Sequence, residues 1–210
     1  MIAPLPYGPY EVIAADPPWA FKTRSGKGKG RSAEKHYPTM GLADIAAIPV
    51  ADIAAKDAFL FFWITGPLFV QGAHIPIMTA WGFTPSAVAF VWAKTNKGAN
   101  DLIAESVKAG DPDPLSLTGL FFRGMGYTTR QNAEYCLIGR RGNPRRVGKS
   151  VPQIITEARR EHSRKPEAFY SRVLDFAGPG VRRLEMFART PRPLWDAWGN
   201  ETEKFAEAAE

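Results

Sequence analysis

Short apolar runs alternate along the chain with segments in which apolar residues recur at helical spacing. The runs are rich in Val, Ile, Phe and Trp and are bounded by Gly, Pro or polar residues, which predicts strands. These predicted strands lie at 10–15, 58–64, 87–93, 134–138 and 183–188. The same analysis predicts helices at 41–56, split in two by Pro49, and at 68–81 and 166–177. The polar segments at 22–36 and 94–119 are expected to be loops or excursions.

The order of these elements defines the fold class. Strands that alternate with helices are typical of an α/β domain with a mostly parallel central sheet and helices on both faces. The run at 58–64 is apolar on both faces, as expected for a central strand that is covered on each side. We expect one domain over residues 1–201 and a frayed, Ala- and Glu-rich tail over 202–210.

Composition excludes several classes of protein. With 45% hydrophobic and 12% aromatic residues among 210, the chain can bury a core and is not expected to be disordered. Its longest apolar run is too short to span a bilayer, and no secretion signal opens the sequence. Cys136 is the only cysteine, which excludes an intramolecular disulfide or a thiolate zinc site, and the three scattered histidines give no metal-binding pattern. We expect a cytoplasmic protein without a metal or a membrane partner.

Positive charge indicates a polyanionic partner. Lys and Arg number 27 against 21 acids, a formal net charge of +6. Two loops concentrate this charge and are candidates to bind nucleic-acid phosphates, with solvated loops as the alternative. The first loop, at 22–36, contributes Lys22, Arg24, Lys27, Lys29, Arg31 and Lys35. The second, at 140–150, contributes Arg140, Arg141, Arg145, Arg146 and Lys149.

The most informative residues follow the first predicted strand. Ligands bind beyond the carboxyl ends of strands in open α/β sheets, and Asp16, Pro17, Pro18 and Trp19 occupy that place. The two prolines fix φ and carry no N–H, so this turn presents acceptor oxygens. A planar ring can stack on Trp19 while its exocyclic amine donates to the Asp16 carboxylate and the Pro17 carbonyl. Such a site suits the methylation of an aryl amine, whereas a proline-stiffened strand exit is the structural alternative.

The wider sequence resembles the N6-adenine methyltransferases that carry the DPPW motif, the relatives of the catalytic subunit of the mRNA adenosine methyltransferase. The resemblance covers about residues 10–201. Besides DPPW at 16–19, the matching motifs are HYPTM (36–40), LFFWITG (60–66), GF (82–83), VWAKTN (91–96), EYCLIG (134–139), RGNP (141–144), HSRKPE (162–167), EMFAR (185–189) and WGNE (198–201). It implies a Rossmann-like class I fold with permuted motif order, in which S-adenosylmethionine donates a methyl group to adenine N6 by direct in-line displacement.

The resemblance also implies roles for particular residues. Asp16, Pro17, Pro18 and Trp19 match the catalytic motif. Residues implied to bind the cofactor are Lys165, Arg189, Asn200, Glu201, Tyr37, Glu185 and Phe187. Lys165 matches the lysine that pairs with the cofactor carboxylate, and Tyr37 matches a gate that covers the reacting centre. Glu134 matches an acid near the target base, beside Trp19 and Tyr37. The chain departs from the family at Pro191 and Arg192, which stand where a His-Asn pair contacts the cofactor ribose.

Several alternatives stay open. A methyltransferase acting on cytosine N4 would use a similar site, and a catalytically silent, nucleic-acid-binding partner subunit would keep the same fold. A nucleotide hydrolase is suggested by the run at 142–150, which is one residue too long for a phosphate-binding P-loop. Because compact relatives are typically bacterial or phage enzymes, the resemblance favours DNA over RNA. A homodimer or a partner subunit is undecided from the sequence.

Overall fold

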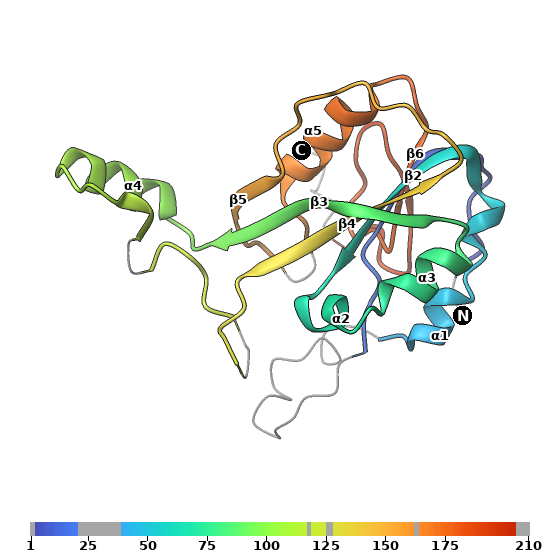
Figure 1. Ribbon diagram of the computed structural model, residues 1–210, viewed down its shortest axis with the longest axis horizontal. Coiled ribbons are helices and arrows are strands. Elements are labelled where there is room, and N and C mark those ends of the chain that lie inside the picture. Colours follow the sequence, from blue (N-terminus) through green and yellow to red (C-terminus); the bar gives the residue numbers. More distant parts are fainter. Residues whose placement is uncertain (1–2, 21–38, 117–118, 125–127, 162–163, 205–210) are drawn as a thin grey trace.

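A seven-stranded sheet organises the fold in this computed structural model, which describes residues 3–20, 39–116, 119–124, 128–161 and 164–204 (Figure 1). The strands are β1 (Tyr10–Ala15), β2 (Ala54–Ile64), β3 (Thr84–Thr95), β4 (Ala133–Arg141), β5 (Ile154–Ala158), β6 (Arg183–Met186) and β7 (Asp196–Trp198). Their order across the sheet is β5-β3-β4-β2-β1-β6-β7. Neighbouring strands are parallel except where β4 pairs with β2 and with β3. The predicted α/β fold with a mostly parallel sheet is confirmed.

The alternation of side chains along β2 builds a hydrophobic core on each face of the sheet. Leu60 and Phe62 belong to one core, which α1 (Leu42–Ala46) and α3 (His74–Ala80) cover. Phe61 and Trp63 belong to the other core, which α5 (Glu167–Ala177) covers. Figure 1 shows the same division, with α5 on one side of the sheet and α1 and α3 on the other. Because successive strand residues point to opposite faces, the continuous apolar run in β2 requires cover on both sides.

Several predicted boundaries agree with the structure. β1 coincides with the predicted strand at 10–15, and α5 starts directly after Pro166, one residue later than predicted. Pro49 separates α1 from a short 3-10 helix, η3 (Val50–Asp52), as the sequence predicts. Proline accounts for these boundaries because it fixes φ and cannot donate a backbone hydrogen bond.

Other predicted elements are wrong. The single helix expected at 68–81 is two helices, α2 (Gly66–Val70) and α3, between which Gly72 adopts a φ of 72°. The segment expected to be a loop at 94–119 contains the ten-residue helix α4 (Ala99–Lys108) and a 3-10 turn, η4 (Pro114–Ser116). β5 and β7 are not predicted, because each is a short edge strand with many exposed positions and gives no apolar run.

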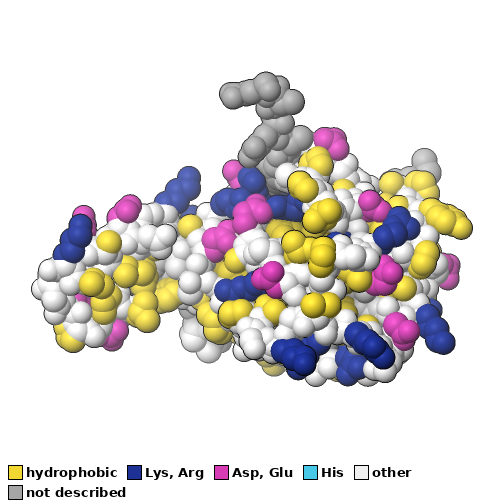
Figure 2. All heavy atoms as spheres, turned by 90° about the horizontal axis from the view of Figure 1, so that it is seen from above, with side chains coloured by type: hydrophobic (Ala, Val, Ile, Leu, Met, Phe, Trp, Pro, Cys, Tyr) yellow, Lys and Arg dark blue, Asp and Glu magenta, His cyan; other side chains and the backbone are white. Residues whose placement is uncertain are grey.

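The helix α4 stands at the end of an arm that projects from the sheet (Figure 1). The arm leaves β3 and returns to β4, and Figure 2 shows hydrophobic side chains along it. Leu102, Val107 and Leu115 are among the exposed large hydrophobic residues of the described chain. In the part of the chain that the structure describes, no helix is long and apolar enough to cross a membrane.

Two predicted segments fall largely or entirely on residues that the structure does not describe. The first basic loop, with Lys22, Arg24, Lys27, Lys29, Arg31 and Lys35, lies outside the described residues, as does Tyr37. Of the predicted tail at 202–210, only 202–204 are described, where they form a turn. The single-domain boundary at residue 201 stays a prediction.

The double-sided core makes a prediction about stability. Phe61 is fully buried between β2 and α5, where its ring contacts Phe90, Phe169 and Phe176. Truncation to alanine leaves a cavity that these rings cannot fill, so Phe61→Ala should lower the free energy of unfolding by about 3–5 kcal/mol in urea titrations. The matched control is Val70→Ala, whose side chain is 88% exposed and should change stability by less than about 0.5 kcal/mol. Equal effects of the two variants would contradict this account of the core.

Candidate active site at the carboxyl edge of β1

Three charged side chains meet at one edge of the sheet because of its topology. β1 ends at Ala15 and β3 ends at Thr95, while the antiparallel β4 starts at Ala133. The start of β4 therefore lies at the same edge as the ends of β1 and β3. This arrangement brings Asp16, Lys94 and Glu134 to a common edge from three separate parts of the chain.

Lys165 joins two carboxylates at this edge. Its Nζ lies 2.8 Å from Asp16 Oδ2 and 2.9 Å from Glu134 Oε2, and the Lys165 side chain is only 7% exposed. The other Glu134 oxygen, Oε1, accepts a hydrogen bond from Lys94 Nζ. Charged groups this poorly hydrated are tolerated only when opposite charges and hydrogen bonds compensate them. The four side chains thus form a buried cluster of alternating sign.

The segment before α5 fixes the position of Lys165. The carboxylate of Glu157 in β5 accepts hydrogen bonds from the backbone N–H groups of Glu167 and Ala168, at 2.9 and 3.2 Å, and so caps the first turn of α5. Arg160 donates to the Lys165 carbonyl at 2.9 Å, while the ammonium lies 5.1 Å from the centroid of the Trp63 ring. Backbone and side chain are therefore held independently of each other.

Mutual attraction and burial shift the pKa values in the cluster. Burial by itself raises the pKa of the Glu134 carboxyl, but Lys165 and Lys94 outweigh it and bring that pKa to about 2. Burial lowers the pKa of Lys165, and the carboxylates of Asp16 and Glu134 reverse this and raise it above the ordinary lysine value. For Asp16, burial raises the pKa and Lys165 opposes that rise. Asp16 is therefore the acid of the cluster best suited to take up a proton.

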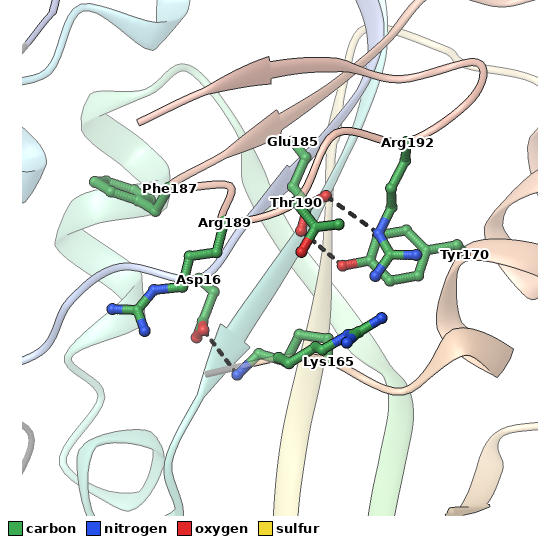
Figure 3. A pocket seen from close by; sticks show the side chains of 9 residues that line it. Asp16, Lys165, Tyr170, Glu185, Phe187, Arg189, Thr190 and Arg192 are labelled. Carbon is green, nitrogen blue, oxygen red and sulfur yellow. Dashed lines mark hydrogen bonds and ion pairs between the residues drawn. The ribbon is translucent and has the colours of Figure 1, made fainter. Parts of the chain in front are cut away.

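A pocket opens beside Asp16 and Lys165 (Figure 3). It is bounded by the end of β6 and the turn that follows this strand, and by one side of α5. The residues that line it are Asp16, Arg164, Lys165, Tyr170, Glu185, Phe187, Arg189, Thr190 and Arg192. The lining combines cations, carboxylates and aromatic rings, which suits a ligand that carries both charges and a flat heterocycle.

Glu185 is the buried acid on the far side of this pocket. Its Oε1 accepts a hydrogen bond of 2.6 Å from the Tyr170 hydroxyl, and its Oε2 lies 3.8 Å from Arg192 Nε. The guanidinium of Arg192 covers the Tyr170 ring at 3.7 Å and is paired with Glu167. Burial raises the pKa of Glu185 to about 7, although Tyr170 and Arg192 favour its ionised form.

The turn after β6 holds Phe187 in an unusual backbone conformation. Phe187 has a φ of 61°, which costs a non-glycine residue roughly 1–2 kcal/mol. Gly199 permits the close approach that holds the turn, because a Cβ there would lie 3.1 Å from backbone atoms of Phe187 and Ala188. The Phe187 ring packs edge-on against Trp198 at 5.4 Å. Strained residues of this kind concentrate at ligand sites, and Phe187 lines the pocket.

Similarity to known proteins identifies the family of this chain. Residues 10–112 and 119–201 match the MT-A70 protein family. The chain belongs to the MT-A70 family. A type II methyltransferase of Mycoplasma, M.MunI, is 29% identical over 94% of the chain and 79% of its own length. The human N(6)-adenosine-methyltransferase catalytic subunit METTL3 is 25% identical over 92% of the chain and 28% of its own length.

Membership of the MT-A70 family confirms the resemblance drawn from the motifs and the methyltransferase class that it implied. A further relative, an N(6)-adenosine-methyltransferase MT-A70-like protein of Drosophila, matches 92% of the chain at 25% identity. The chain spans only about a quarter of the length of the Drosophila and human proteins but most of the Mycoplasma enzyme.

The structure brings most of the expected MT-A70 site residues together. Asp16, Lys165, Glu185, Phe187 and Arg189 line one pocket. Glu134 reaches the same place through Lys165. Glu201 pairs with Arg189 at 2.9 Å, whereas Asn200 is an exposed residue in the same turn. The particular roles expected of these residues toward a cofactor or a base stay predictions.

Lys165 does not stand free in this structure. It was expected to pair with a cofactor carboxylate, but two of its three N–H donors are directed to Asp16 and Glu134. One donor is left for any further partner. The geometry therefore ties Lys165 to the catalytic motif as closely as to the pocket.

Trp19 is a core residue in this structure, so the expected stacking of a base on its ring is not supported. Its side chain is 4% exposed and belongs to the core on the α1–α3 face, where it contacts Phe62 edge-on at 5.5 Å. Asp16 instead lies with Lys165 and Trp63 on the α5 face. Pro17 and Pro18 separate the two, and the Pro17 carbonyl accepts the Trp19 N–H at 2.9 Å, which tightens the turn.

The second basic loop lies at the wrong edge of the sheet to hold a base beside Asp16. Arg141 pairs with Ala58 at the start of β2, and its guanidinium donates to the Ala51 carbonyl at 2.6 Å. Because Arg141 follows Glu134 by seven strand residues, it lies about 23 Å along β4 from the ion cluster. Arg140, Arg145, Arg146 and Lys149 share that opposite edge or the loop beyond it. This loop therefore does not lie beside Asp16, and the expected binding of nucleic-acid phosphates by its residues stays a prediction.

The sequence analysis missed four pocket residues and Lys94. Tyr170 has the spacing of a core residue in α5, and Thr190 directly follows the matched EMFAR motif. Arg164 lies within the matched HSRKPE motif, where only Lys165 was given a role. Arg192 was noticed only as a departure from the family motif. Lys94 lies within the matched VWAKTN motif, which was an available signal of a functional role. Among the described residues, no group of three or more His, Cys, Asp or Glu side chains could hold a metal ion.

The raised pKa of Glu185 predicts how stability changes with pH. A carboxyl whose pKa rises from 4.5 to about 7 on folding binds its proton more tightly in the folded chain. Its contribution to stability is complete below pH 4.5 and is lost as the pH rises through 7. Relative to wild type, Glu185→Gln should therefore gain up to about 3 kcal/mol of unfolding free energy between pH 5 and pH 8. Urea titrations at the two pH values measure the free energy of unfolding. The control is Glu105→Gln, an exposed position at which the variant should follow wild type. The same change with pH in wild type and both variants would contradict the prediction.

Proposed function

We propose that this chain transfers the methyl group of S-adenosylmethionine to N6 of adenine in nucleic acid, with DNA favoured over RNA. The observation that carries the proposal is the Asp16 carboxylate, held by Lys165 at 2.8 Å beside a pocket at the carboxyl end of β1. Membership of the MT-A70 family, with relatives named as type II and N(6)-adenosine methyltransferases, supports the reaction class.

The residues of the pocket fit S-adenosylmethionine. The cofactor carries a carboxylate, a ribose diol, an adenine ring and a sulfonium cation. Arg164 and Arg192 offer donors to a carboxylate, and the acid Glu185 can accept hydrogen bonds from a diol or an amine. Phe187 supplies an aromatic face at the strained turn, and Tyr170 supplies a second ring. When bound, the cofactor supplies an electrophilic methyl group.

Asp16 orients the amine that is methylated. Its carboxylate accepts one N–H of the exocyclic amine, and the Pro17 carbonyl, which has a second lone pair beside its bond to Trp19, accepts the other. With both protons directed at acceptors, the nitrogen lone pair would point toward the electrophilic methyl carbon. As the new C–N bond formed, the C–S bond would break and its electron pair would leave with the sulfur of S-adenosylhomocysteine. The nitrogen then carries an extra proton, which passes to Asp16, whose pKa is raised by burial. Catalysis is therefore mainly positioning by preorganised acceptors.

The preference for DNA rests on the similarity to a type II methyltransferase of Mycoplasma. The chain is 29% identical to that enzyme over 94% of the chain, and 25% identical to human METTL3 over 92% of the chain. A target base in a duplex has to leave the stack to reach a pocket of this kind.

Methylation assays with Asp16 variants test the proposed function. The chain is incubated with labelled S-adenosylmethionine and separate pools of single- and double-stranded DNA and RNA, and the modified nucleoside is identified by mass spectrometry. We expect N6-methyladenine in DNA. Asp16→Ala and the shape-conserving Asp16→Asn should lower the rate at least about 100-fold, because Ala removes the acceptor for the amine and Asn removes the charged group that takes up the proton. The dissociation constant of S-adenosylhomocysteine should change less than about threefold.

The control for this experiment is Asp175→Ala, an exposed acid of α5 that should leave the rate unchanged. An active Asp16→Ala enzyme would end the assignment of Asp16. N4-methylcytosine as the product would replace the proposal by the cytosine alternative. If the chain binds the cofactor or nucleic acid but transfers no methyl group in any of the pools, the result would favour the silent partner subunit.

Charge reversal of the two basic loops tests how nucleic acid is held. Changing Lys27, Lys29 and Arg31 to Glu should raise the dissociation constant for DNA at least about tenfold and reduce its dependence on salt concentration, since fewer counterions are released. The matched control changes Arg145 and Arg146 to Glu, in the loop at the opposite edge of the sheet from Asp16. It should alter the dissociation constant for DNA less than about threefold. A larger loss of DNA affinity in the Arg145 and Arg146 variant than in the first-loop variant would refute the assignment of DNA binding to the first loop. Fluorescence anisotropy over a range of salt concentrations gives both quantities.

A further inference from the structure

Lys94 makes an ion pair with Glu134 that neither the pocket nor the catalytic motif accounts for. The two residues lie on the neighbouring strands β3 and β4, where Trp92 is directly opposite Glu134 and Lys94 is its diagonal neighbour. Lys94 Nζ donates to Glu134 Oε1, and both side chains are about four-fifths buried, at 19% and 20% exposure. Lys94 does not line the pocket beside Asp16. Its effect on that site must therefore pass through Glu134.

The ion pair is the outer end of a chain of alternating charges. Lys94 contacts Glu134, Glu134 contacts Lys165 at 2.9 Å, and Lys165 contacts Asp16 at 2.8 Å. The two cations and two carboxylates balance each other. Each Glu134 oxygen has its own cation, so neither oxygen competes with the other for the Lys165 ammonium.

Removal of Lys94 would change this balance. Glu134 Oε1 would be left in a poorly hydrated place without its cation, and the carboxylate would turn to share Lys165 through both oxygens. The ammonium would then be drawn toward Glu134 and away from Asp16 Oδ2. Asp16 would then lose the ion pair that fixes the direction of its carboxylate. Because the Asp16 side chain is only 23% exposed, water could not fully replace that contact.

The side chain of Lys94 is itself held in place. Its ammonium lies 4.8 Å from the centroid of the Trp92 ring, and Trp92 Nε1 donates to the Glu157 carbonyl at 2.8 Å. The Glu157 side chain caps the first turn of α5, and this helix begins directly after Lys165 and Pro166. The same framework therefore supports both cations that Glu134 contacts.

We propose that Lys94 is a positioning residue for methyl transfer: by holding one oxygen of Glu134, it leaves the other to direct Lys165 onto Asp16. This inference rests on the proposed function and adds a residue to its machinery. Lys94 contacts neither the base nor the cofactor in this proposal. The distances that carry it are those of the Lys94–Glu134–Lys165–Asp16 chain.

A double-mutant cycle tests whether Lys94 acts through Glu134. We expect Lys94→Met to lower kcat about tenfold while the KM for S-adenosylmethionine changes less than about twofold, and Lys94→Arg to restore most of the loss. In a Glu134→Gln background, Lys94→Met should change kcat less than about twofold, because the carboxylate that it holds is gone. Full additivity of the two substitutions overturns the proposal. Lys56→Met, an exposed strand lysine at the opposite edge of the sheet, is the control and should match wild type.

Titration of Glu134 gives a readout that does not depend on activity. Carboxyl NMR of labelled protein should report a Glu134 pKa of about 2 in wild type and a higher value in Lys94→Met, since a carboxyl that loses a neighbouring cation binds its proton more readily. The groups that face Glu134 are Lys94 from β3, Lys165 from the segment before α5 and Asp16 from the end of β1. The Lys56→Met control should leave this pKa unchanged. An unchanged value in Lys94→Met overturns the proposal.

The outcomes separate this inference from the proposed function. If wild type transfers no methyl group to any substrate pool, the proposed function fails and the role of Lys94 in it fails as well. If wild type is active and Lys94→Met retains its kcat, only the assignment of Lys94 is overturned. A lower melting temperature for Lys94→Met with an unchanged kcat would likewise identify the ion pair as structural and overturn the assignment.

Discussion

The site depends on one buried ammonium shared by two carboxylates. Lys165 is almost fully removed from water, and its contacts with Asp16 and Glu134 are the main compensation for the cost of burying its charge. Those contacts join the end of β1, the start of β4 and the entry to α5. Because each charged group would be costly to bury without its partners, the ion cluster couples these three segments to one another. The packing of α5 against the sheet and the direction of the Asp16 carboxylate both depend on the position of Lys165.

The antiparallel strand β4 makes this cluster possible. In a sheet with all strands parallel, the start of β4 would lie at the opposite edge from the end of β1, and Glu134 could not reach Lys165. The reversal of β4 between β3 and β2 places a strand start beside two strand ends. The same reversal carries Arg140 and Arg141 to the far edge, about seven residues away along the strand. One topological feature therefore brings an acid to the site and takes the second basic loop away from it.

The sequence predicts local features of this fold better than contacts between distant segments. The strand β1 and the residue Asp16 were predictable, because a short apolar run followed by two prolines has few other structures. The contact of Lys94 with Glu134 joins residues 40 apart, and the direction of β4 decides it, which periodicity does not report. The helix α4 was missed because the Gly, Pro and Asp residues around it favoured a loop, although Leu102, Ile103 and Val107 have the spacing of one helix face. Trp19 was expected at the ligand because an aromatic residue after a strand has no signal that distinguishes a stacking platform from a core residue.

The burial of Trp19 shows how the turn from Asp16 to Trp19 is held in place. Trp19 fixes the turn from the α1–α3 face by hydrophobic packing against Phe62, while Lys165 fixes Asp16 from the α5 face by charge. The two prolines between them transmit little rotation, since their φ angles are fixed. The direction of the Asp16 carboxylate is then determined from both faces of the sheet at once. Loss of the packing would move the whole turn and lower stability, whereas loss of the ion pair would free only the carboxylate. Stability and methyl transfer should for this reason respond separately to changes on the two faces.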